Sequence, residues 1–121
     1  MFAVVLYFDP ESEEYIINLQ KAISRETGNS RILDAGIPPH ITLTIVSARC
    51  DDCFIQAVDE FTQTLTQENI VFPSIGIFNT DPGVLFLAPV VSVALKKMNK
   101  ELYLKFQPLC ASIDPFYTPD M

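Results

Sequence analysis

Apolar and polar positions alternate along the chain in a way that predicts both strands and helices. Residues 2–8 form an unbroken apolar run, which predicts a central strand buried on both faces. Residues 40–47 alternate apolar and polar side chains with the period of a strand. Two more strands are expected over residues 70–78 and 84–91, joined by a turn at residues 79–83 that has the composition of a hairpin loop.

Other segments place apolar residues three and four positions apart, the spacing that aligns them on one face of a helix. The first predicted helix begins at Pro10, is capped by Asp9 and ends at Gly28. A second is expected over residues 51–65, and a third begins near Ser92. The apolar faces of these helices comprise Ile16, Leu19 and Ile23, then Phe54, Val58, Phe61 and Leu65, then Leu95, Met98, Leu102, Phe106 and Leu109.

Residues 30–39 are expected to be a loop because they contain Gly36 and the pair Pro38-Pro39, and residues 113–121, with two prolines, are expected to be a second loop. The order strand, helix, strand, helix, strand, strand, helix predicts an α+β fold, with a mixed or largely antiparallel sheet and helices packed on one side. No linker composition interrupts the chain, so a single domain over residues 1–121 is expected.

Composition and charge exclude several classes of protein. Of the 121 residues, 49% are hydrophobic and only 19% are charged, which excludes disorder as the main state. The formal charge of −7 would repel duplex DNA, so contacts with nucleic acid should be local. The longest apolar stretch, residues 84–91, is too short to span a membrane, and residues 1–9 lack a basic leader, so we expect a cytoplasmic protein.

The three cysteines are an odd number in a chain without a secretion signal, so free thiols are expected. Cys50 and Cys53 enclose Asp51 and Asp52, either of which can cap the second helix. The Cys-x-x-Cys spacing also permits a thiol–disulfide function, although the two carboxylates oppose thiolate formation. A structural zinc site requires four ligands, which these residues do not supply, so no metal is expected.

His40 is the only histidine, and it begins a predicted strand two residues before Thr42. An imidazole can move a proton near neutral pH, while a hydroxyl on the same face of the strand can bind a phosphoryl oxygen. The simpler interpretation is that a histidine at this position caps a loop carbonyl.

The segment Pro39-His40-Ile41-Thr42-Leu43 resembles the His-x-Thr motif of the two-histidine (2H) phosphoesterase superfamily, in its 2′-5′ RNA ligase-like branch. The order of predicted elements is similar over most of the chain. The resemblance implies a fold of two lobes facing a groove, each contributing one His-x-Thr motif, and it implies no cofactor. It further implies hydrolase or ligase chemistry on a 2′,3′-cyclic phosphate or 2′-5′ phosphodiester of a nucleotide or RNA end, with His40 as general acid or base and Thr42 as a phosphate hydrogen-bond donor.

Three other side chains are candidates for the same site. Tyr7 could stack on a base or reach a phosphate if it shares a face with His40, although a tyrosine completing the core is the simpler interpretation. Arg31 and Arg49 flank the motif strand in sequence, and arginine suits phosphate, but nothing in the sequence places either at the site.

The sequence departs from the family pattern because it contains no second histidine. The segment Phe116-Tyr117-Thr118-Pro119 resembles the approach to the second motif, so that motif is expected beyond Met121 and the 121 residues alone are expected to be impaired. An incomplete lobe would leave a sheet edge open to a second copy of the chain, which favours a homodimer. The alternatives are a phosphate-binding module without turnover and a thiol–disulfide protein using Cys50 and Cys53.

Overall fold

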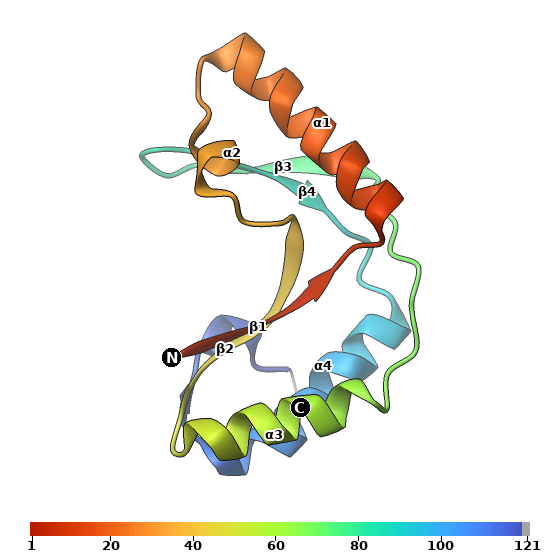
Figure 1. Ribbon diagram of the computed structural model, residues 1–121, viewed down its shortest axis with the longest axis vertical. Coiled ribbons are helices and arrows are strands. Elements are labelled where there is room, and N and C mark those ends of the chain that lie inside the picture. The colour runs from red at the N-terminus through yellow and green to blue at the C-terminus, as the bar shows by residue number, and fades with distance from the viewer. Residues whose placement is uncertain (120–121) are drawn as a thin grey trace. The chain divides into compact units, whose positions relative to one another are not determined.

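The computed structural model describes residues 1–119, and the fold is α+β, as the sequence predicts (Figure 1). The chain divides into two compact units, the first over residues 1–45 and the second from Val46 onward. Asp120 and Met121, the end of the predicted terminal loop, lie outside the described residues. Within the described part of the chain, no helix has both the length and the apolar character needed to cross a membrane.

The first unit contains the elements that carry the sequence motif. They are strand β1 (Phe2–Tyr7), helix α1 (Pro10–Thr27), the short helix α2 (Arg31–Ala35) and the first part of strand β2 (His40–Ala48). The caps of α1 are those predicted: the Asp9 carboxylate accepts a hydrogen bond from the Ser12 N–H at 3.2 Å, and Gly28 ends the helix with φ of 73°. That left-handed conformation suits glycine, which has no Cβ to clash with the following carbonyl.

The Asp9 cap makes the stability of α1 depend on pH. Hydrogen bonds from Ser12, by its hydroxyl and then its backbone N–H, hold the pKa of Asp9 below its ordinary value of 3.8. The cap is therefore fully stabilising above the ordinary pKa and is lost as the pH falls through the lower folded-state pKa. We expect Asp9→Asn, which keeps a capping side chain but cannot titrate, to lose less thermal stability than the wild type between about pH 6 and about pH 3.

Thermal unfolding followed by circular dichroism measures this difference. Glu14→Gln removes one exposed carboxylate from the same helix outside the cap, so this variant should keep the acid sensitivity of the wild type. An equal acid sensitivity of Asp9→Asn and the wild type would show that the cap does not contribute to it.

Strand β2 is central in a three-stranded sheet with the order β1-β2-β5. The prediction that residues 2–8 form a central strand buried on both faces is therefore wrong, because β1 lies at the edge of the sheet and exposes Ala3 and Tyr7. Strand β2 instead buries both Leu43 and Thr44, which point to opposite faces.

The second unit contains most of the remaining elements. They are helix α3 (Asp51–Thr62), strands β3 (Ser74–Phe78) and β4 (Val84–Ala88), helix α4 (Val93–Phe106), strand β5 (Cys110–Ile113), and the 3₁₀ turns η1 (Gln107–Leu109) and η2 (Pro115–Tyr117). The end of β2 pairs with β5 in antiparallel fashion, and β3 pairs with β4 as the predicted hairpin. Within this hairpin the ring of Phe86 lies over Gly76, where no side chain obstructs it, and stacks on Phe78 at 4.6 Å between ring centroids.

Helices α3 and α4 lie side by side and form the main core of the second unit (Figure 1). The ring of Phe106 on α4 is completely buried and contacts two rings of α3, with centroid distances of 5.0 Å to Phe54 and 5.7 Å to Phe61. Met98 and Leu102 complete the buried face of α4. The apolar faces predicted from helical spacing for α3 and α4 therefore pack against each other.

Several predicted boundaries are wrong for local reasons. The predicted loop at residues 30–39 contains helix α2. The third strand begins only after Pro73 and the fourth ends before Pro89, consistent with the lack of a donor N–H in proline. Helix α3 ends at Thr62, so Leu65 lies beyond it. Helix α4 ends at Phe106, so Leu109, which was predicted on the third helix, lies in η1 instead. Cys110–Ile113 form a strand because they pair with β2.

Candidate functional site

His40 begins strand β2, and its ring is exposed rather than sealed in a core. The Nδ1 atom lies 2.8 Å from the carbonyl oxygen of Pro38. A carbonyl can only accept, so Nδ1 must carry the hydrogen and donate it. The predicted contact with a loop carbonyl is thus present, and it leaves the other ring nitrogen, Nε2, without a hydrogen-bond partner among the described residues.

The Pro38 contact determines what the ring can do. With the hydrogen on Nδ1, a neutral imidazole has its lone pair on Nε2, which is then a proton acceptor. If Nε2 takes up a proton, the same carbonyl stabilises the resulting imidazolium through Nδ1. This arrangement favours a general base in the resting state, a role that the sequence left open between acid and base.

Sequence reasoning expected a loop carbonyl at the ring but did not identify it as that of Pro38, although the sequence contains a signal for it. Proline restricts the residue before it to an extended conformation, so the pair Pro38-Pro39 gives the chain little freedom before His40. Pro39 is buried, which fixes this segment further. The carbonyl two residues before the imidazole is therefore held in place by its own neighbours.

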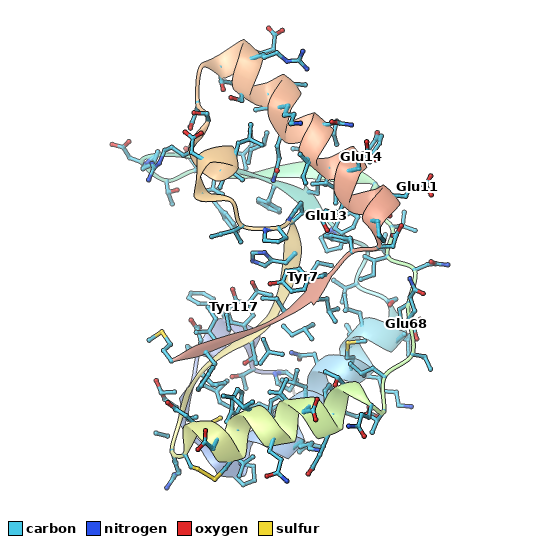
Figure 2. The ribbon with its side chains drawn as sticks, viewed as in Figure 1. Tyr7, Glu11, Glu13, Glu14, Glu68 and Tyr117 are labelled. Carbon is cyan, nitrogen blue, oxygen red and sulfur yellow. A yellow bond between two sulfur atoms is a disulfide. The ribbon has the colours of Figure 1, made fainter. Side chains whose placement is uncertain are left out.

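Tyr7 ends strand β1 (Figure 2). Its ring meets the His40 ring edge to face, with centroids 6.4 Å apart and planes at 80°. The Tyr7 side chain is 64% exposed. Its ring contact with His40 meets the condition under which Tyr7 could serve the site, and its binding role stays a prediction. An exposed aromatic ring beside an exposed imidazole offers a flat surface on which a nucleobase can stack.

Thr42 lies two residues beyond His40 on β2, and it is half-buried. Alternate residues of a strand point to the same face, so its hydroxyl and the His40 imidazole share one face of β2. The first unit thus brings His40 and Tyr7 into contact and places Thr42 one step along the same strand.

The charged residues that follow β1 in the first unit are mostly negative. Asp9 lies two residues beyond Tyr7, and Glu11, Glu13 and Glu14 lie along the first turns of α1, where Figure 2 labels the three glutamates. Arg49 is engaged elsewhere, because its guanidinium Nε donates to the Cys110 carbonyl at 3.1 Å in the second unit. Arg31 begins α2 and is exposed, with no contact to His40 in the described structure. Carboxylates near the site disfavour a polyanion and are compatible with a small ligand of low charge.

The cysteines differ from the prediction of free thiols. Cys50 and Cys53 form a disulfide, with Cα atoms 5.3 Å apart, because both lie at the start of α3 within one helical turn. Cys50, rather than Asp51 or Asp52, is the N-cap of this helix, and its sulfur accepts a hydrogen bond from the Cys53 N–H at 3.3 Å. Only Cys110 is a free thiol, and its burial raises its pKa, an effect that the nearby Arg49 charge partly offsets.

Across residues 1–119, no group of three or more histidine, cysteine, aspartate or glutamate side chains is arranged to hold a metal ion. Comparison with known proteins adds no family: no family model, no curated protein and no solved structure matches the chain. The functional argument therefore depends on the geometry at His40.

Proposed function

We propose that the chain carries half of a phosphoesterase site that acts on a 2′,3′-cyclic phosphate or a 2′-5′ phosphodiester of a nucleotide or RNA end. The observation that carries this proposal is the exposed His40 ring, which has Nδ1 held by the Pro38 carbonyl and Nε2 available on the face that Thr42 shares. The resemblance of this segment to the 2H phosphoesterase motif supports the same assignment.

In the proposed reaction, His40 Nε2 accepts the proton of the attacking water or hydroxyl, and the Pro38 carbonyl stabilises the imidazolium that forms. The Thr42 hydroxyl donates to a non-bridging phosphoryl oxygen as charge develops there. Tyr7 stacks on the base next to the scissile phosphate. The acidic surroundings favour a mononucleotide or a terminus over a long RNA.

Complete catalysis also requires a group that protonates the leaving oxygen. A two-histidine mechanism takes this proton from a second imidazole, and the sequence contains only His40. This observation favours a second candidate function, a module that binds the phosphate ester without turnover. The two candidates share the binding contacts and differ only in whether product forms.

Titration of the chain with a 2′,3′-cyclic nucleotide, followed by NMR of the His40 ring, tests the proposal. Since this is the only histidine, its ring resonances are assigned without ambiguity. We expect the resonances on the Nε2 side of the ring to shift and to saturate with nucleotide concentration, and Thr42→Val to weaken the affinity. A 2′- or 3′-monophosphate should also appear slowly. Saturable shifts without product support the binding module, and the absence of shifts at any ligand concentration overturns both candidates.

A further inference from the structure

The Cys50–Cys53 disulfide lies at the surface, at the first turn of α3, and the proposed phosphate site does not use it. Both cysteines are exposed, whereas the free thiol of Cys110 is buried. An external thiol can therefore reach the disulfide in the folded protein and does not have to open the core first.

Helix α3 can keep its structure when the disulfide is reduced. The Cys50 sulfur accepts the Cys53 N–H as the cap of α3, and a reduced sulfur at the same position can accept this bond as well. The Cys53 N–H and the partial positive charge of the helix N-terminus both favour a thiolate at Cys50, against the opposing charge of Asp51 and Asp52, and the hydrogen bond makes Cys50 the better leaving group of the pair. The body of α3 is anchored independently by the buried rings of Phe54 and Phe61.

The two residues between the cysteines determine which thiols can react. Asp51 and Asp52 are both exposed and place two carboxylates within the four-residue loop that the disulfide closes. Arg49, which is adjacent to Cys50 in sequence, donates to the Cys110 carbonyl and keeps its charge, so its single positive charge offsets only one of the two carboxylates. Exchange requires an incoming thiolate, which is an anion. The negative charge of Asp51 and Asp52 therefore slows the reaction of thiols that carry further negative charge and favours thiols that carry a positively charged group.

We propose that Cys50 and Cys53 form a reversible thiol–disulfide exchange site whose partner is a thiol in cationic surroundings. The incoming thiolate attacks the Cys53 sulfur, the intramolecular bond breaks, and Cys50 leaves as a thiolate. A second thiol attacks the mixed disulfide, and Cys53 is released. Two thiols of the partner are oxidised to one disulfide, and the Cys50–Cys53 disulfide is reduced to two thiols, which take up the two protons.

Counting thiols by mass after alkylation under denaturing conditions tests reversibility. We expect one alkylated cysteine in the oxidised chain, three after native treatment with dithiothreitol, and one again after oxidised glutathione is added, with an unchanged circular dichroism spectrum. Cys110→Ser should lower each count by one. A disulfide that opens only in denaturant, or whose opening unfolds the chain, would overturn the proposal.

The choice of partner is tested with small thiols of different charge, namely cysteamine, 2-mercaptoethanol and 2-mercaptoethanesulfonate. Each rate of reduction is divided by the rate at which the same thiol reduces a small neutral disulfide. We expect cysteamine to exceed the sulfonate by roughly threefold to tenfold at low ionic strength, and the ratio to approach one in high salt. Equal normalised rates for the three thiols would overturn the charge preference.

Charge variants locate the origin of this preference. Neutralising both loop residues, with Asp51→Asn and Asp52→Asn together, should remove most of the difference between cysteamine and the sulfonate. Asp59→Asn neutralises an exposed carboxylate about 12 Å further along the same helix and should leave the difference unchanged. If the double variant keeps the full difference, the loop carboxylates do not select the partner.

Discussion

Phe106→Ala is expected to lower the free energy of unfolding by about 3–5 kcal/mol, the range for a fully buried aromatic side chain. The Phe106 ring is 0% exposed and contacts both the Phe54 and the Phe61 ring of α3, so its removal leaves a cavity bounded by both helices of the second unit. Because domains of this size have only about 5–15 kcal/mol of stability, the variant should be close to unfolding at physiological temperature. Urea denaturation followed by circular dichroism measures the loss.

Phe116→Ala is the matched control for this prediction, since it makes the same chemical change at a side chain that is 93% exposed. Its effect should stay within about 0.5 kcal/mol of zero. Equal losses in the two variants, or a loss below about 1 kcal/mol for Phe106→Ala, would contradict the role of the Phe106 cluster as the core of the second unit.

The helices that form this core could be predicted because their signals are local. Phe54 and Phe61 on one helix, and Met98, Leu102 and Phe106 on the other, follow helical spacing, and the structure buries all of them. The Asp9 cap was equally visible, because an acidic residue before a proline is a typical helix start. Such features depend on neighbours a few residues away.

The features that sequence reasoning missed depend on partners that are distant in the chain or on backbone conformation. Cys110–Ile113 has no strand signal of its own and is a strand only because it pairs with β2, more than sixty residues earlier. The placement of residues 2–8 at a sheet edge depends on the same strand order. At the candidate site, His40 and Thr42 were found from their spacing, whereas the carbonyl of Pro38 that orients the ring became visible only in the structure.

His40→Ala is expected to lower any 2′,3′-cyclic nucleotide hydrolysis by the protein by about 10²- to 10⁴-fold, the usual contribution of one general acid–base group. Because Nδ1 is held by the Pro38 carbonyl, Nε2 is the only ring nitrogen that can exchange a proton with a substrate. His40→Gln should fall into the same range, since an amide can reproduce a hydrogen bond but cannot accept the proton of water. Steady-state kinetics with purified variants measure the loss.

Tyr7→Phe provides the control that separates proton transfer from stacking. It keeps the ring that contacts His40 and removes only the hydroxyl, so a stacking role predicts nearly unchanged kcat and KM, whereas Tyr7→Ala should raise KM. The two histidine variants should instead lower kcat, because proton transfer occurs in the transition state. If His40→Ala retained the wild-type kcat, the imidazole would be a cap for the loop carbonyl alone, and the catalytic proposal would be rejected.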